Sequence, residues 1–179
     1  MIVMMGPVGV GKSVQGQLLA DKISYNWFSL GKYLRESASA SAQEKLASGV
    51  LFSDEEVIEI IDSEIGKTIT NQTVLDGFPR TLPQSEWIVG LHREKRINIE
   101  AVVVLLADED VLVKRLLARG RPDDSEEVIK DRIHTYNSST RPIIDWFKNQ
   151  GVQVQEINGV GEIEDISNNI VKALKKDAH

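Results

Sequence analysis

With 179 residues, of which 41% are hydrophobic and 27% charged, the chain has the size and composition of one globular domain with its own core. Its apolar runs fall far short of the roughly 20 residues that a membrane-spanning helix needs, so no membrane association is expected. A net charge of -6 argues against a nonspecific nucleic-acid-binding protein. The chain has no cysteine, which excludes disulfides and thiol chemistry, and no zinc is expected. Since no signal-peptide pattern is present either, a cytoplasmic location is expected.

The stretch from Gly6 to Ser13, GPVGVGKS, follows the apolar run Ile2–Met5 and precedes apolar residues at helical spacing. A strand, a G-x-x-x-x-G-K-S loop and a helix in this order predict a phosphate-binding P-loop. Glycines let successive backbone N–H groups surround a phosphate, and the first turn of the helix adds further donors at its positive end. In such a loop Lys12 supplies a positive charge to the phosphate oxygens, and Ser13 stands where a hydroxyl commonly holds Mg²⁺. The motif therefore predicts that a nucleoside triphosphate binds here.

The next part of the chain is mainly helical in pattern. The expected elements are the P-loop helix at 14–23, a strand at 26–29, a short helix within 30–36, a helix-compatible stretch at 37–48 and an amphipathic helix at 53–67. Ser53 and Glu56 have capping-box spacing at the start of the last of these helices. Residues 30–67 are therefore predicted to form a helical insert between two strands.

From residue 73 onward, strands and helices alternate. The expected order is strand 73–76, loop 77–80, a helix with Pro83 in its first turn, strand 101–106, helix 108–120, a helix capped by Asp124 that Pro142 bends or restarts, strand 152–157 and helix 163–174. The continuous apolar run 101–106 is typical of a central parallel strand covered on both faces. The predicted fold class is α/β, with a parallel sheet of about five strands between layers of helices. Ligands of such a sheet bind beyond the carboxyl ends of its strands.

A second motif follows the strand at 73–76: LDGFPRTLPQ, residues 75–84. With this motif the sequence resembles the adenylate kinases, of the nucleoside monophosphate kinase family with the P-loop fold. The resemblance extends almost from end to end, and also includes GPVGVGKS with Gln15 soon after, LGKYLR at 30–35, and RPDD at 121–124 followed by Arg132. Two specific motifs in the right order make coincidence improbable.

The resemblance implies a monomeric enzyme that transfers the γ-phosphoryl group of ATP to AMP, with Mg²⁺, by direct in-line displacement. It implies a single kinase domain with a core at 1–29, 68–118 and 126–179, an insert at 30–67 that binds the monophosphate, and a short lid at 119–125. Its partners would be ATP and a nucleoside monophosphate, with AMP favoured, and no nucleic acid.

The resemblance also assigns residues to roles. On the ATP side it implies Gly9, Val10, Gly11, Lys12, Ser13 and Val14 around the phosphates, Arg119 and Gly161 at the adenine end, and Arg115 as a further ATP-binding residue. On the AMP side it implies Arg35 and Arg80 as a clamp on the phosphate and Gln84 on the adenine. The other residues implied on this side are Leu30, Val50, Leu51, Phe52, Gly77, Phe78, Pro79, Arg121 and Arg132. The residues converging on the transferred group, and so catalytic, would be Lys12, Arg80, Arg115, Arg119, Arg121 and Arg132. Ser13 and Asp76 would hold Mg²⁺, Asp76 through water.

The chemistry of such a transfer fits these residue types. At neutral pH the second ionisation of a phosphate, near pH 6, leaves the acceptor oxygen largely anionic, so no general base is required. Catalysis then depends on holding two polyanions in line and neutralising charge, which calls for lysine, arginine and Mg²⁺. Arginine suits this because its planar fork binds phosphate oxygens with two donors and stays ionised. No Ser-His-Asp set or cluster of metal ligands competes with this interpretation.

Other interpretations of several residues remain open at this point. Arg115 and Arg119, one helical turn apart, are either catalytic or solvent-facing charges of their helix. Asp123 and Asp124 serve either lid closure or helix capping. Where the family usually has S-T-G-D, this chain has Ser29-Leu30-Gly31-Lys32, so CMP, UMP or dAMP is the alternative acceptor. Lys32 either strengthens capture of the phosphate or displaces Arg35.

The short lid and two alternative functions give further hypotheses. Only Gly120 separates Arg119 from Arg121, so the lid is close to minimal, and slow turnover or some hydrolysis of ATP is expected. The rivals are a P-loop regulatory nucleotide-binding module and a scaffold with weak catalysis. The regulatory module is disfavoured because the chain has no N-K-x-D guanine signature and because such a module needs no second nucleotide clamp.

Overall fold

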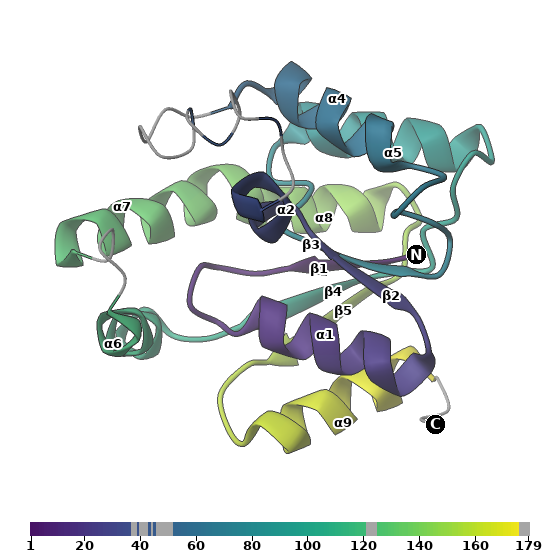
Figure 1. The fold of residues 1–179 in the computed structure, drawn as a ribbon. Coiled ribbons are helices and arrows are strands. Elements are labelled where there is room, and N and C mark those ends of the chain that lie inside the picture. The colour runs from purple at the N-terminus through teal and green to yellow at the C-terminus, as the bar shows by residue number, and fades with distance from the viewer. Residues whose placement is uncertain (37–38, 40–42, 44, 46–51, 121–124, 176–179) are drawn as a thin grey trace.

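In the computed structural model of the protein, the described residues are 1–36, 39, 43, 45, 52–120 and 125–175. They form a five-stranded sheet with the order β2-β3-β1-β4-β5 (Figure 1), in which every neighbouring pair is parallel. The strands are β1 (Ile2–Met5), β2 (Asn26–Ser29), β3 (Thr73–Asp76), β4 (Ala101–Leu106) and β5 (Val154–Asn158). This confirms the predicted α/β class and the strand count.

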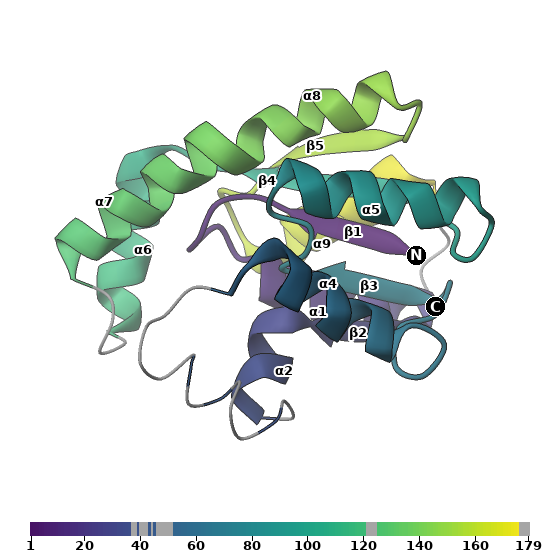
Figure 2. The same ribbon diagram turned by 90° about the horizontal axis from the view of Figure 1, so that it is seen from above.

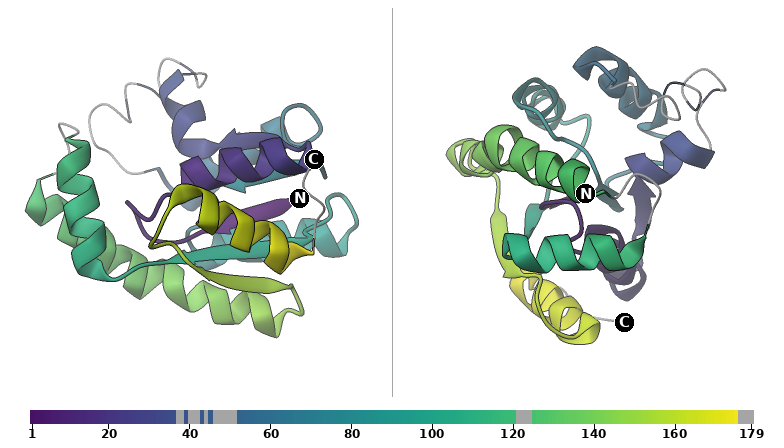
Figure 3. Two further views of the ribbon diagram at one scale, coloured as in Figure 1. Left: turned by 90° about the horizontal axis from the view of Figure 1, so that it is seen from below. Right: turned by 90° about the vertical axis from the view of Figure 1, so that its left-hand side faces the viewer.

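Helices cover both faces of the sheet. The helices are α1 (Lys12–Ile23), α2 (Leu30–Glu36), α4 (Asp54–Glu64), α5 (Leu82–Arg93), α6 (Glu109–Arg119), α7 (Glu126–Thr135), the π-helix η1 (Tyr136–Thr140), α8 (Arg141–Asn149) and α9 (Ile163–Leu174). On one face α1 and α9 lie across the strands (Figure 3, left), and on the other lie α4, α5 and α8 (Figure 2). Among the described residues, no helix is long and apolar enough to cross a membrane.

The alternation of side chains along β1 explains the two cores. Val3 and Met5 pack with the cluster beneath α5 and α8, whereas Ile2 and Met4 pack with the cluster beneath α1 and α9. All four side chains are at most 2% exposed, which is why the strand reads as a continuous apolar run.

Several predicted helix boundaries were wrong by one to three residues. Helix α1 begins at Lys12 instead of residue 14, because Gly11, with φ of 105°, serves as its N-cap. Helix α4 ends at Glu64 instead of 67, since Ile65 turns to an extended conformation. The predicted capping box of Ser53 and Glu56 is confirmed.

The segment from α7 to α8 differs most from the expectation. Ser125, instead of Asp124, caps α7 by accepting a hydrogen bond from the Val128 N–H; Asp123 and Asp124 themselves lie outside the described residues. The break predicted at Pro142 lies one turn earlier, in η1, where the Arg141 N–H bonds to the Tyr136 carbonyl five residues back. Because Pro142 has no N–H, it cannot donate the hydrogen bond that an α-helix requires at this position. The wider turn of the π-helix lets the chain continue as a helix up to the proline. The last strand likewise begins at 154, not 152.

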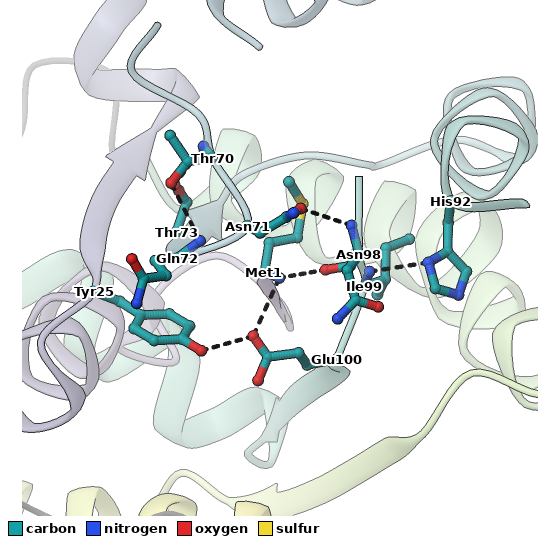
Figure 4. A network of polar contacts seen from close by, with 10 residues as sticks. All are labelled: Met1, Tyr25, Thr70, Asn71, Gln72, Thr73, His92, Asn98, Ile99 and Glu100. Atoms are coloured by element: carbon teal, nitrogen blue, oxygen red, sulfur yellow. Dashed lines mark hydrogen bonds and ion pairs between the residues drawn. The ribbon is translucent and has the colours of Figure 1, made fainter. Parts of the chain in front are cut away.

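The amino-terminal edge of the sheet carries a polar network (Figure 4). The buried ammonium group of Met1 donates to the Asn98 carbonyl and lies 3.4 Å from Oε1 of Glu100, which also accepts a 2.8 Å hydrogen bond from the Tyr25 hydroxyl. These bonds connect β1 to the segments that precede β2 and β4. The P-loop and the motif after β3 lie at the opposite, carboxyl edge of the sheet, so this network is separate from both.

Candidate active site

The P-loop lies between β1 and α1, at the carboxyl edge of the sheet. Its glycine at position 9 has φ of 83°, and a Cβ there would come within 2.7 Å of Cγ of Leu116 on α6. A side chain at position 9 would therefore push α6 away from the loop. Within the loop the Lys12 ammonium donates a 2.7 Å hydrogen bond to the Pro7 carbonyl, so the lysine is folded over the loop it belongs to.

Ser13 and Asp76 connect the P-loop to the second motif. The Ser13 hydroxyl donates a 2.6 Å hydrogen bond to Oδ2 of Asp76, whose side chain is buried at the end of β3. A hydroxyl and a carboxylate beside a phosphate loop fit Mg²⁺, which takes one or two protein oxygens and fills its other positions with phosphates and water. The described residues contain no group of three or more His, Cys, Asp or Glu that would form an all-protein metal cage, and Mg²⁺ needs none.

Positive side chains from segments far apart in the sequence lie near one another beside Asp76 and Lys12. The pKa of Lys12 is lowered to about 8, mainly by desolvation; Asp76 opposes this shift, and Arg80 and Arg119 add to it. Arg80 is exposed, yet nearby protein removes enough water to lower the pKa of its guanidinium, with Asp76 opposing and Arg132 adding to the effect. Lys12 and Arg80 thus both lie near Asp76, with Arg119 near Lys12 and Arg132 near Arg80. Such an excess of positive charge favours a polyanionic ligand.

The side chains of Arg80 and Arg35 each lie close to a glycine, Gly77 and Gly31 respectively. A Cβ at Gly77, where φ is 87°, would come within 3.2 Å of Nη2 of Arg80 and 3.9 Å of the Gly31 nitrogen. A Cβ at Gly31 would come within 3.4 Å of Nη1 of Arg35. Arg80 is also held by a 2.8 Å hydrogen bond from its Nε to the Gly77 carbonyl. Gly77 and Gly31 thus lie near each other, with the Arg80 guanidinium against the first and the Arg35 guanidinium against the second.

Gln84 lies in the first turn of α5 with only 4% of its surface exposed, and both ends of its amide have partners. Its Oε1 accepts a 2.8 Å hydrogen bond from the Arg80 N–H, and its Nε2 donates a 2.8 Å bond to Oδ1 of Asp54. The Thr81 hydroxyl donates to the same Asp54 oxygen at 2.8 Å. The sequence did not predict that Asp54 and Thr81 contact Gln84 or each other. The capping-box pattern already explained the presence of Asp54 in the first turn of α4.

Arg115 connects two loops of the site. Its Nη1 donates to the carbonyls of Val10, at 3.2 Å, and of Gly159, at 2.9 Å, so it joins the P-loop to the loop after β5. This half-buried arginine is therefore not a solvent-facing helix charge, which was one of the two interpretations. Arg119, one turn later, is exposed and lies near enough to Lys12 to affect its pKa.

A further link escaped the sequence analysis. The Thr140 hydroxyl at the end of η1 donates a 2.9 Å hydrogen bond to the Arg80 carbonyl. The long α7–η1–α8 segment is thereby tied to the motif after β3. No pattern in the sequence could have indicated this bond, because its partners are 60 residues apart.

The remaining predicted site residues have different surroundings. Leu30 and Phe78 are 3% and 0% exposed and belong to the core, so they offer a ligand mainly their backbone. The Phe78–Pro79 peptide bond is cis. Phe52 is half-buried, Val14 on α1 is 50% exposed, and Gly161 lies exposed in the loop after β5. Val50, Leu51 and Arg121 lie outside the described residues.

Comparison with known proteins gives a consistent answer. The family model described as adenylate kinase matches residues 4–152. A protein of Leptospira biflexa described as adenylate kinase is 38% identical over 184 residues, which cover 97% of this chain and 98% of the relative. Adenylate kinases of a Synechococcus strain and of Corynebacterium urealyticum are 36% and 34% identical, and each alignment covers at least 97% of both chains.

Proposed function

The chain belongs to the adenylate kinase family, and from that premise we propose which of its residues carry out the reaction. The protein is an ATP:AMP phosphotransferase: it moves the γ-phosphoryl group of ATP onto AMP and yields ADP from both. The proposal is supported above all by Lys12 and Arg80, which both lie near the Asp76 carboxylate, with Arg119 near Lys12 and Arg132 near Arg80.

We propose that the two nucleotides bind on either side of this cluster. On the ATP side, the P-loop backbone from Gly9 to Val14 surrounds the phosphates and Lys12 contacts their oxygens. On the AMP side, Arg35 and Arg80 bind the phosphate and Gln84 binds the base. The remaining arginines, Arg115, Arg119, Arg121 and Arg132, neutralise charge on the transferred group, and Arg115 also holds the P-loop in place.

The protein supplies position and charge in this scheme, without a general base. The AMP phosphate is already largely anionic at neutral pH, so it attacks without giving up a proton to a side chain. In a loose transition state, negative charge lies on the oxygens of the phosphoryl group in transit, and guanidinium groups fixed beforehand stabilise that charge. Ser13 and Asp76 would hold Mg²⁺, which when bound neutralises the ATP phosphates.

We further propose that residues 1–29, 68–118 and 126–179 form the core, residues 30–67 the insert that binds AMP, and residues 119–125 a short lid. A lid this short excludes water incompletely, so slow hydrolysis of ATP is expected without AMP. Phosphate release measured with and without AMP tests this; fast transfer with no detectable hydrolysis would contradict it. The protein is proposed to work as a cytoplasmic monomer.

The proposal is tested by measuring ADP production in wild type and in Arg80→Ala. We expect a loss of about a hundredfold or more, because the substitution removes charge from both the clamp and the region of transfer. Arg93→Ala, which removes an exposed arginine at the end of α5, is the matched control and should leave activity unchanged. Wild-type activity in Arg80→Ala would refute the assignment.

Acceptor choice is tested separately. Leu30 is buried and has no hydroxyl, while Lys32 lies 5.6 Å from the centre of the Trp27 ring and 4.0 Å from Glu36. Lys32 thus has one neighbour in β2 and one in its own helix. We therefore propose AMP as the preferred acceptor, and a panel of AMP, dAMP, CMP and UMP decides it: a higher kcat/KM for a pyrimidine nucleotide would overturn this choice.

A further inference from the structure

Asp54, the first residue of α4, makes hydrogen bonds that helix capping does not explain. Its Oδ1 accepts from the Gln84 Nε2 and from the Thr81 hydroxyl, each at 2.8 Å. Both donors belong to the start of α5, in the core, whereas Asp54 belongs to the insert. The N-terminus of α4 is already capped by Ser53 and Glu56, so this carboxylate is available for another role.

The partners of Gln84 determine which end of its amide is oxygen. A carboxylate only accepts hydrogen bonds and a backbone N–H only donates them. Asp54 therefore holds the NH₂ end, and the Arg80 N–H holds the oxygen end, at 2.8 Å each. A flipped amide would set two acceptors against each other at Asp54 and two donors against each other at Arg80. Because Gln84 is 4% exposed, water is poorly placed to relieve either contact.

The amide held in this way keeps one free hydrogen-bonding site at each end. An amide group has two acceptor lone pairs and two N–H donors, and one of each is engaged. What remains is one lone pair on Oε1 and one N–H on Nε2. The Watson–Crick edge of adenine presents the amino donor at position 6 beside the acceptor nitrogen N1. This donor and acceptor match the free lone pair and the free N–H of Gln84. A 6-oxopurine, as in IMP, presents an acceptor oxygen beside an N–H, which is the reverse order.

We propose that Asp54 is a positioning residue that fixes the orientation of the Gln84 amide and thereby sets the preference for adenine over a 6-oxopurine at the acceptor site. This inference rests on the proposed contact between Gln84 and the base of the acceptor. Asp54 does not touch the nucleotide in this scheme; it acts through Gln84. Thr81 supports it by donating to the same oxygen and so limiting the rotation of the carboxylate.

The test compares Asp54→Ala with Glu55→Ala. Both substitutions remove a carboxylate from the first turn of α4, and so have similar effects on the helix dipole, but Glu55 is exposed and makes no contact with Gln84 in the described bonds. We expect Asp54→Ala to raise the KM for AMP about tenfold with the KM for ATP unchanged, because one acceptor contact becomes poorly aligned. Glu55→Ala should change neither value.

Selectivity is the measurement that a purely structural role would not alter. The ratio of kcat/KM for AMP to that for IMP should fall about tenfold in Asp54→Ala; if IMP is not turned over, its inhibition constant against AMP replaces that value. Asp54→Asn keeps an accepting oxygen and should retain most of the preference. An unchanged ratio in Asp54→Ala, or an equal rise of both KM values, would overturn the inference.

A double-mutant cycle separates this inference from the function proposed for Gln84. If Gln84→Ala leaves the KM for AMP and the selectivity unchanged, the proposed contact with the base is wrong. If Gln84→Ala changes both but Asp54→Ala changes neither, only the role of Asp54 is refuted. When Gln84 is already alanine, the further change Asp54→Ala should have no additional effect on selectivity; a full additional effect would show that Asp54 acts by another route.

Discussion

The hydroxyl of Ser13 donates a hydrogen bond of 2.6 Å to Oδ2 of Asp76 and thereby joins the start of α1 to the end of β3. The two residues are brought together by the sheet, because β1 and β3 are parallel neighbours in which Met4 pairs with Asp76. Parallel strands end at the same edge, so the loop after one strand meets the loop after the next. The P-loop and the motif after β3 therefore meet at one edge of the sheet.

The first prediction concerns Asp76. Asp76→Asn keeps the size of the side chain and an accepting oxygen but removes the negative charge that would help hold Mg²⁺. We expect the Mg²⁺ concentration for half-maximal activity to rise about tenfold, because the metal prefers charged oxygen ligands. Activity titrated against free Mg²⁺ measures this. Asp62→Asn, at a carboxylate that is 49% exposed and paired with Arg96, is the control. An unchanged Mg²⁺ requirement in Asp76→Asn would exclude a role in metal binding.

The second prediction concerns pH and follows from the pKa of Lys12, which desolvation lowers to about 8 from an ordinary value of 10.5. ATP favours the protonated lysine, so binding weakens as the pH rises through this pKa in the free protein. The KM for ATP is expected to rise about tenfold between pH 7 and pH 9, with little change in the KM for AMP. A KM for ATP that stays flat to pH 9 would show that Lys12 remains charged throughout.

The lowered pKa of Lys12 weakens ATP binding as the pH rises, but it has the opposite effect on the free energy of unfolding. Between pH 8 and 10.5 the unfolded chain keeps its lysine proton while folded Lys12 has lost it, so the unfolded state binds more protons. The contribution of Lys12 therefore makes the free energy of unfolding increase with pH in this range. Comparing urea unfolding of wild type and Lys12→Met across the range isolates this contribution, since the methionine variant lacks the ionisable group.

The third prediction concerns Arg115, which holds the Val10 and Gly159 carbonyls. Arg115→Met removes both bonds and leaves two carbonyls without this partner, so we expect a loss of about 1–3 kcal/mol in the free energy of unfolding. The KM for ATP should also rise, since the P-loop loses its anchor. The exposed Arg96, paired with Asp62 at 3.4 Å, provides a control in Arg96→Met, for which a change below about 0.5 kcal/mol is expected. Equal effects of the two variants would argue against the anchoring role.

The fourth prediction concerns the amino edge of the sheet. Tyr25→Phe deletes the hydroxyl that donates to Glu100 at 2.8 Å and should cost about 1–2 kcal/mol of stability, because the acceptor is charged and partly buried. Kinetic constants should stay at wild-type values, since this network and the nucleotide motifs lie at opposite edges. Tyr33→Phe deletes a longer bond, 3.2 Å to Glu64, and should cost less in the same urea titration. A changed KM in Tyr25→Phe would indicate coupling between the two edges.

The strands and both nucleotide motifs were predictable because they depend on local requirements. The central strands β1 and β4 are apolar runs, and a glycine at position 9 or 77 is required by the backbone at that point. Helix ends were less predictable. Asp124 and Ser125 are both good capping residues, and the choice of Ser125 depends on where the chain enters α7. The π-helix before Pro142 was missed, because a proline shows that the regular helix is interrupted but not how the chain accommodates it.

By itself the sequence determined the α/β class, the P-loop and the acceptor motif, because spacing and residue type alone specify these features. Only the tertiary structure decided which polar groups meet: Asp54 with Gln84, Arg115 with two loop carbonyls, and Thr140 with Arg80. A hydrogen bond acts over about 3 Å. Which residues come within that distance depends on how all the elements pack together, and no short stretch of sequence contains that information.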